Sequence, residues 1–153
     1  MTGLTGPHHF EMEGWISCAP FEQLLQMQII ETSEGCATLK MPFLVDFAQG
    51  GGLMHGGALV TLADTAVAMA IKSVIPAGTQ FVTVSLSAEF LHAVKLGVMT
   101  AKAKATCQGG SKWKGEASVY DEAGRVVLEF SSVFRVLNGV QEAMCGGTGT
   151  PSH

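Results

Sequence analysis

Hydrophobic and polar residues are spaced differently in different parts of this chain, and the changes mark its predicted elements. Residues 28–32 and 36–43 are rich in residue types that favour strands, and a short turn ending in Gly35 separates them. Glycine can take the positive φ that a tight turn needs, so this region predicts a β-hairpin. Before it, Pro20 predicts the start of a short helix over residues 21–27, because proline is tolerated in a first helical turn.

The next segment is apolar on every side. Between residues 56 and 71 the only formal charge is Asp64. A helix without a polar face must be buried, and Pro76 ends the stretch, so the pattern predicts a buried helix over Gly56–Lys72. The stretch is nearly long enough to cross a bilayer. A carboxylate near its centre would cost roughly 2.5–3.5 kcal/mol there, which disfavours a membrane span.

Beyond the helix the hydrophobic period shortens to two, which is the period of a strand. Four runs with short polar links follow this pattern: residues 81–90, 98–107, 113–120 and 126–137. In the first run, Val82, Val84 and Leu86 belong to a predicted dry face, and Thr83 belongs to the opposite, polar face. Consecutive strands with short links predict a four-stranded antiparallel meander.

The hairpin and the four later strands can form one sheet if another element packs against its apolar face. Gly56–Lys72 is the only predicted element long and apolar enough to provide that cover. The predicted fold is therefore α+β, with an antiparallel sheet wrapped around one central helix. We expect a single domain over residues 14–137, a flexible N-terminal arm over residues 1–13, and a disordered tail over residues 138–153.

Composition narrows the classes of function. The chain has 153 residues, a net charge of −4 and no cluster of Lys and Arg, which argues against nucleic-acid binding. Hydrophobic residues make up 47% and charged residues 14%, so part of the apolar surface is expected to lie between subunits of a homo-oligomer. The four cysteines have no zinc-ligand spacing and no signal peptide precedes them. We expect reduced thiols, a cytoplasmic location and no metal site.

The chemistry is concentrated in and just before the central helix. Glycines and His55 precede it, which leaves backbone N–H groups free at a helix start, where negative charge is favoured. Asp64 lies within the same helix, and the combination suggests acyl chemistry at a carbonyl. A structural alternative has Asp64 hydrogen-bonded to Thr61 or Thr65, and His55 bonded to a backbone carbonyl. The glycine pattern matches neither a P-loop nor a dinucleotide loop.

Two segments resemble the hotdog-fold thioesterases, in particular the phenylacetate-type branch of the 4-hydroxybenzoyl-CoA thioesterase superfamily. The stretch from Gly52 to Asp64 is similar to that family's G-x-x-HGG-x(6)-D core, and residues 82–91 resemble the strand that follows its helix. The likeness extends over residues 21–136. It implies a six-stranded hotdog fold.

The resemblance also assigns roles to individual residues. It makes Asp64 the general base or nucleophile, and the N–H of Gly56 the donor that polarises the thioester carbonyl. His55 would orient the substrate or the helix start. Gln49 stands where that branch usually has an asparagine that holds the attacking water, and Thr83 stands where a hydroxyl can bind the same water.

The activity implied is hydrolysis of an aryl-acetyl or medium-chain acyl-CoA, with coenzyme A as part of the substrate and no cofactor. Four residues are expected to contact the substrate: Gly57, Ser111, Lys112 and Lys114. The helix rise of about 1.5 Å per residue separates Gly56 from Asp64 by roughly 12 Å, so each site is expected to combine two chains. Alternatives are a hotdog enoyl-CoA hydratase or dehydratase, and a non-catalytic acyl-CoA-binding protein.

Overall fold

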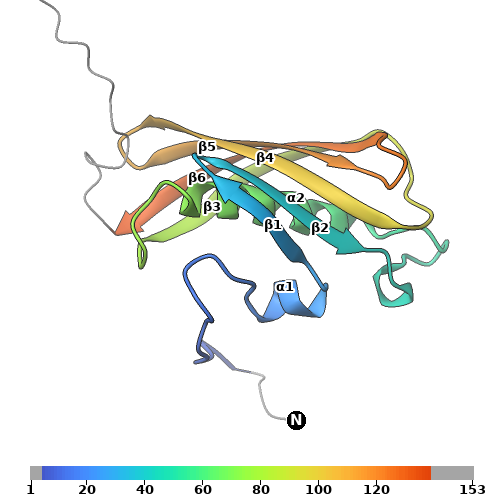
Figure 1. The fold of residues 1–153 in the computed structure, drawn as a ribbon, viewed down its shortest axis with the longest axis horizontal. Coiled ribbons are helices and arrows are strands. Elements are labelled where there is room, and N and C mark those ends of the chain that lie inside the picture. The colour runs from blue at the N-terminus through green and yellow to red at the C-terminus, as the bar shows by residue number, and fades with distance from the viewer. Residues whose placement is uncertain (1–4, 139–153) are drawn as a thin grey trace, which may run out of the picture.

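The computed structural model describes residues 5–138, which form one curved sheet with a long helix along its inner face (Figure 1). The elements, in chain order, are α1 Pro20–Leu24, β1 Gln28–Ser33, β2 Cys36–Pro42, the 3₁₀ helix η1 Val45–Phe47, α2 Gly56–Lys72, β3 Gln80–Phe90, β4 Val98–Gly109, β5 Lys112–Tyr120 and β6 Val126–Asn138. The predicted bounds of the central helix are confirmed. The first helix is shorter than the predicted 21–27.

All neighbouring strands are antiparallel, in the order β1-β2-β4-β5-β6-β3. The predicted α+β fold, six strands around one helix, is therefore confirmed. The predicted four-stranded meander is wrong, because β3 pairs with β6 at the far edge and β4 pairs with β2. Residues 91–97 connect β3 to β4 across three strand spacings, or about 14 Å, which a link of this length can span.

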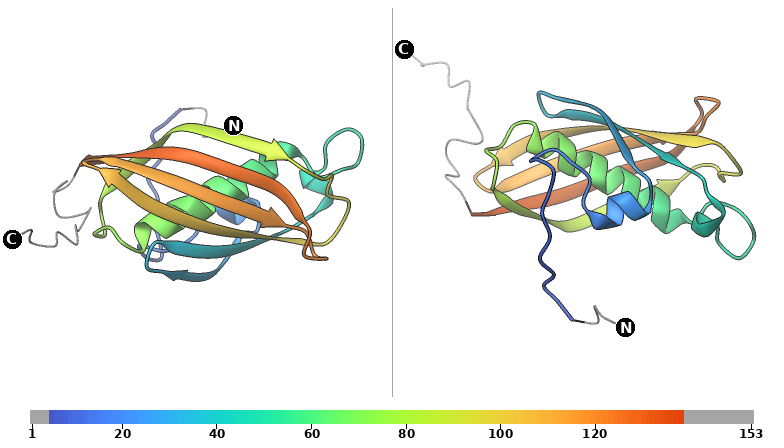
Figure 2. Two further views of the ribbon diagram at one scale, coloured as in Figure 1. Left: turned by 90° about the horizontal axis from the view of Figure 1, so that it is seen from above. Right: turned by 60° about the horizontal axis from the view of Figure 1, so that its bottom comes forward.

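The core lies between α2 and the inner faces of the strands. The predicted dry faces of β4 and β5 are confirmed by their buried residues: Met99, Ala101, Ala103, Ala105, Trp113, Ala117 and Val119. The helix packs tightly on β5 at Gly115, where a Cβ would lie 2.2 Å from Val67 Cγ1. Only a residue without a side chain allows this approach. It lets α2 lie on the sheet as Figure 2 shows.

The predicted dry face of β3 is wrong at its start and right at its end. Val82 and Val84 are 42% and 50% exposed, and Thr83 faces a carboxylate on α2. Toward the end of the strand, Ala88 packs against the core and Phe90 faces the start of α2, as predicted. The pairing of β3 with β6 shifts its register between Thr83 and Ser85. An irregularity of this kind changes which side chains share a face, and simple alternation cannot reveal it. β3 is also an edge strand, so half of its apolar side chains have no cover within one chain.

The predictions for the chain ends and the cysteines are confirmed only in part. Residues 5–13 contain no helix or strand, Asn138 belongs to β6, and the rest of the predicted tail lies outside the described residues. Cys18 and Cys36 are free thiols, as expected. Cys107 is disulfide-bonded, so the expectation of reduced thiols is wrong for this residue. No helix within residues 5–138 has the length and apolar character needed to cross a bilayer.

Candidate active site

A carboxylate and a hydroxyl meet between α2 and β3. Thr83 Oγ1 donates to Asp64, with distances of 3.0 Å to Oδ1 and 3.3 Å to Oδ2. The intrahelical alternative fails for Thr61, whose hydroxyl donates to the carbonyl of Gly57. Burial raises the pKa of Asp64, and the hydrogen bond from Thr83 opposes that rise. A carboxylate in such surroundings is a better base than a solvated one.

Asp64 opens onto a trough of about 580 Å³ that follows the side of α2. Its walls come from the N-terminal segment, α2, the start of β3 and the end of β6: Trp15, Glu22, Asp64, Thr65, Ala68, Lys72, Thr79, Gln80, Phe81, Val82, Thr83, Phe134 and Leu137. Burial lowers the pKa of Lys72, while the Glu22 carboxylate raises it. Trp15 and Lys72 were not predicted as site residues. Trp15 reaches the trough only because the N-terminal segment folds back against α2.

The second group of predicted residues stands at the start of α2. His55 is the N-cap, and its Nδ1 accepts the N–H of Gly57 at 2.8 Å, so neutral His55 carries its proton on Nε2. Within residues 5–138 the N–H of Gly56 has no acceptor. A Cβ at Gly56 would lie 2.9 Å from the ring of Phe90. The glycine therefore leaves a free donor between the helix start and β3.

The two groups do not meet within one chain. Gly56 and Asp64 are eight residues apart on one helix, or about 12 Å along its axis. Gln49 is tied to its own loop, because its side-chain oxygen accepts the N–H of Gly51. One protomer thus holds an acid with its hydroxyl partner at one place and a helix-start donor at another.

The residues predicted to contact the substrate are divided. Gly57 lies at the helix start, whereas Ser111, Lys112 and Lys114 lie at the β4–β5 turn and on β5. Both lysines are on the face of the sheet away from α2, since Trp113 between them is buried. Lys114 forms an ion pair with Glu116 at 3.0 Å. Lys112 lies opposite Arg135 on β6, a second cation that the sequence did not single out.

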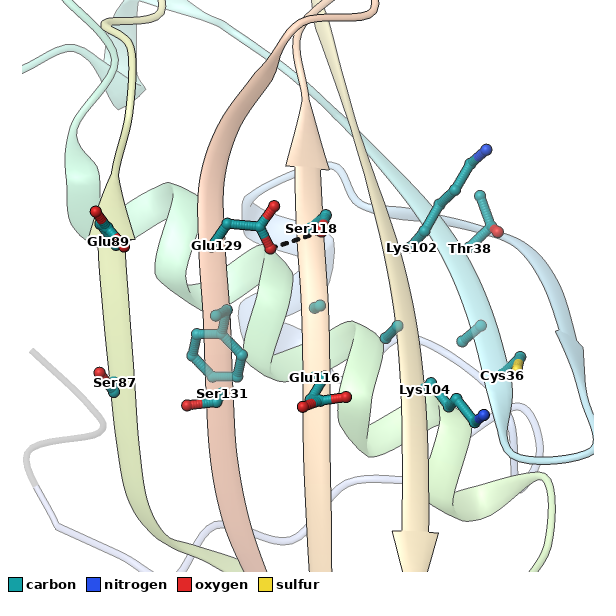
Figure 3. A pocket seen from close by; sticks show the side chains of 14 residues that line it. Cys36, Thr38, Ser87, Glu89, Lys102, Lys104, Glu116, Ser118, Glu129 and Ser131 are labelled. Carbon is teal, nitrogen blue, oxygen red and sulfur yellow. Dashed lines mark hydrogen bonds between the residues drawn. The ribbon is translucent and has the colours of Figure 1, made fainter.

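A second hollow, of about 640 Å³, crosses the outer face of the sheet. Figure 3 shows its polar side chains on the side of the strands away from α2, with Lys102 and Lys104 on β4 and the carboxylates of Glu89, Glu116 and Glu129 on β3, β5 and β6. The dashed line in Figure 3 marks the hydrogen bond that Ser118 Oγ donates to Glu129 Oε2 at 2.8 Å. These are solvent-facing side chains, and none of the predicted catalytic residues lines this hollow.

Among residues 5–138 there is no group of three or more His, Cys, Asp or Glu side chains that could hold a metal ion. The donor set at Asp64 is one carboxylate and one hydroxyl, which alone would bind a divalent cation weakly. Catalysis without a metal stays a prediction.

Comparison with known proteins identifies the family. Residues 51–128, which contain the helix start, Asp64 and Thr83, match the family model of the thioesterase superfamily. The chain belongs to this superfamily. It is a thioester hydrolase with the hotdog fold, and the predicted family is confirmed.

Individual relatives agree with this placement. ComA2 of Bacillus subtilis, whose name describes it as a provisional esterase, is 33% identical over 107 residues, which cover 69% of this chain and 84% of ComA2. The structure of PaaI from the phenylacetic acid degradation operon of E. coli is 26% identical, with a TM-score of 0.72, and the match covers 80% of this chain and 87% of PaaI. A hypothetical thioesterase from Streptococcus pneumoniae, solved with coenzyme A, is 25% identical, with a TM-score of 0.67, covering 73% of this chain and 86% of that one.

Proposed function

We propose that this hydrolase cleaves the thioester of an aryl-acetyl or medium-chain acyl-CoA, with Asp64 as the general base or nucleophile. The observation that carries the proposal is the half-buried Asp64 carboxylate, held by Thr83 at the mouth of a trough of about 580 Å³. The aromatic walls of the trough suit an aryl or alkyl group. The Streptococcus pneumoniae relative was solved with coenzyme A, which supports a CoA thioester as the substrate class.

The residues suit the two demands of thioester hydrolysis. Attack on the carbonyl places negative charge on its oxygen, and a preorganised N–H at a helix start, such as that of Gly56, stabilises this charge. The attacking water needs a base, or the carbonyl carbon needs a carboxylate nucleophile, and Asp64 can serve as either. The tetrahedral intermediate then collapses as the C–S bond breaks, and the thiolate of coenzyme A takes up the proton lost by the attacking water. Where Asp64 is the nucleophile, water hydrolyses the acyl–Asp64 anhydride in a second step. Thr83, and Gln49 from its loop, are proposed to position the water.

The distance between Gly56 and Asp64 supports a site shared by two chains. Both groups must lie about 3 Å from the reacting atoms, and an Asp side chain cannot cross the roughly 12 Å between them. A two-fold axis that sets two α2 helices antiparallel would bring Asp64 of one copy to Gly56 of the other. The free edge of β3, with exposed Val82, Leu86 and Phe90, is the surface we assign to this contact.

A panel of CoA thioesters tests the activity. We expect purified protein to release free thiol from aryl-acetyl or medium-chain acyl-CoAs, and to keep this activity in EDTA. An absorbance change with enoyl-CoA in place of thiol release would indicate a hydratase. Binding of acyl-CoA with neither signal would indicate a binding protein. Loss of activity in EDTA that added metal restores would contradict a metal-free mechanism.

Mixed dimers test the shared site. Asp64→Asn disables the acid, and Gly56→Pro removes the N–H. The helix should still form in Gly56→Pro, because proline is tolerated at a first helical position once the Phe90 ring moves aside. A heterodimer of the two variants has one site with both groups intact and one with neither. Co-refolded mixtures should regain about half of the wild-type activity per heterodimer. Heterodimers verified as folded that are no more active than either parent would rule out the shared site.

A further inference from the structure

The N-terminal segment is fastened to the end of α2 by a reciprocal contact that we call the Trp15–Lys72 clasp. The indole N–H of Trp15 donates to the backbone oxygen of Lys72 at 3.0 Å, and Lys72 Nζ donates to the backbone oxygen of Trp15 at 3.1 Å. The same ammonium lies 4.8 Å from the centre of the indole ring, within the range of a cation–π interaction. Figure 2 shows the segment passing this end of the helix.

The clasp stands at the opposite end of the trough from the candidate catalytic acid. Asp64, Ala68 and Lys72 follow one another at four-residue intervals, so they share one side of α2, and the first and last are about 12 Å apart along the axis. All three line the trough, as does Trp15. The wall between them includes Phe81 and Phe134, whose ring centroids are 5.8 Å apart. The trough therefore leads from an acid past two aromatic rings and Ala68 to an indole.

This geometry constrains an acyl group whose carbonyl reacts beside Asp64. Within the trough, its chain would extend along α2 toward the clasp. A zigzag chain of about ten carbons spans 12 Å, because C–C bonds of about 1.5 Å at tetrahedral angles each advance the chain by about 1.25 Å. A longer chain would meet the indole of Trp15, which is held from two directions and cannot simply rotate away.

We propose that Trp15 is a specificity-determining residue, which closes the trough and sets the longest acyl chain that the protein accommodates at about nine or ten carbons. The inference rests on the proposed function, because it takes the trough as the acyl site. Lys72 is a positioning residue in this scheme. Its ammonium donates to the backbone of Trp15 and lies over the indole ring, and both contacts hold the indole in place.

Binding measurements on a protein that cannot turn over test the proposal. In an Asp64→Asn background, we would measure the affinity for saturated acyl-CoAs from butanoyl to hexadecanoyl by titration calorimetry. Affinity should rise about fourfold for each buried methylene and stop rising near decanoyl. With Trp15→Ala added, the affinity should continue to rise beyond decanoyl. The ratio of tetradecanoyl to octanoyl affinity should then exceed that of the Asp64→Asn parent by at least about tenfold, which is the gain from two further buried methylenes.

Two further variants separate loss of the wall from general damage. Phe21→Ala removes an aromatic ring from the same segment, but Phe21 is 56% exposed and outside the trough, so the length profile should stay that of the parent. Lys72→Met keeps the stem and removes the ammonium. It should shift the limit in the same direction as Trp15→Ala, but less, and should add nothing in the presence of Trp15→Ala.

The outcomes distinguish this inference from the proposed function. A Trp15→Ala protein that is folded by circular dichroism and keeps the parental length limit overturns the clasp proposal. Thiol release is measured over the same series with Asp64 intact. If the protein with Asp64 intact releases no thiol, but Trp15→Ala removes the length limit in binding, hydrolysis is overturned and the clasp proposal is supported. Release with a limit that Trp15→Ala leaves unmoved would overturn the clasp alone.

Discussion

Two hollows of similar size lie on opposite faces of one sheet, at about 580 Å³ beside α2 and about 640 Å³ on the outer face. Each contains a hydroxyl that donates to a carboxylate: Thr83 to Asp64 in the first, and Ser118 to Glu129 in the second. The carboxylate beside α2 is half-buried among aromatic and aliphatic walls, and its pKa is raised by burial. Glu129 faces solvent across the open surface of the strands.

The difference shows that neither the volume of a hollow nor its content of polar groups identifies a site. What distinguishes Asp64 is desolvation, because a carboxylate removed from water gains basicity that an exposed one lacks. The covering helix produces that desolvation, and the outer face has no cover within one chain. Three of the predictions below therefore pair a change beside α2 with a matched change on the outer face.

The largest expected effect is on catalysis. Asp64→Asn keeps the size of the side chain and removes the base or nucleophile, so kcat should fall by at least about 100-fold. Glu116→Gln makes the same chemical change in the outer hollow and should leave kcat within about twofold of wild type. Thiol release under saturating substrate measures both. Near-normal turnover by Asp64→Asn would remove the catalytic assignment, and a large loss in Glu116→Gln would point to the outer hollow instead.

The next effect is on stability. Gly115→Ala places a methyl group 2.2 Å from Val67 Cγ1 and 2.7 Å from Ser132 Oγ, so α2 must move away from β5. Overpacking of this kind should lower the free energy of unfolding by about 1–3 kcal/mol. Thr106→Ala, at an exposed position on the outer face of β4, should change it by less than about 0.5 kcal/mol. Urea denaturation compares the two, and equal values would contradict close packing at Gly115.

These contrasts also separate what the sequence reveals from what it does not. The bounds of α2 followed from its uniform apolar character, and the buried faces of β4 and β5 followed from strict alternation. The helix-start donor and Asp64 were recognisable because glycines and a lone acid are unusual in such a segment. All of these are local signals, carried by neighbouring residues.

The errors concern information that is not local. The position of β3 beside β6 depends on strand pairing across the whole sheet, and nothing within residues 81–90 encodes it. The register shift near Thr83 depends on the partner strand, so alternation assigned Val82 to the core and left Thr83 opposite it. Trp15 joined the trough only through contacts with Lys72, 57 positions away in the chain. Separations of this size leave no periodic pattern to recognise.

A subtler effect is expected on the pH dependence of activity. The hydrogen bond from Thr83 lowers the pKa of Asp64, so Thr83→Val should raise that pKa further. Because Asp64 acts as its carboxylate, the acid limb of kcat/KM against pH should move to higher pH. Ser118→Ala removes the corresponding hydroxyl in the outer hollow and should leave the profile unchanged. An acid limb that stays in place in Thr83→Val would mean that another group controls it.

Stability should depend on pH through the same carboxylate. Burial raises the folded-state pKa of Asp64 above its unfolded value, so ionisation costs more in the folded protein. This cost is absent below the unfolded pKa of about 3.9 and is complete above the raised folded pKa. Asp64→Asn removes it, so the variant should gain stability relative to wild type as pH rises through this window. Urea denaturation at several pH values measures the trend, and a constant difference would contradict a raised pKa.

The smallest expected effect concerns Lys112, on the outer face at the β4–β5 turn. Its neighbour across the strands is Arg135, and among residues 5–138 Lys112 forms no ion pair, whereas Lys114 is paired with Glu116. Two adjacent cations favour a phosphate group through charge-assisted hydrogen bonds. If CoA phosphates bind there, Lys112→Ala should raise KM a few-fold at low salt and less at high salt, without changing kcat.

The matched variant for this last comparison is Lys104→Ala. Lys104 is also an exposed cation on the outer face, but a carboxylate, that of Glu116, and not a second cation stands opposite it on β5. Its loss should leave KM for acyl-CoA unchanged at either salt concentration. A rise in KM confined to Lys112→Ala would locate the phosphates at the β4–β5 turn, away from the hollow of Figure 3. An unchanged KM in Lys112→Ala at both salt concentrations would exclude this turn from CoA binding.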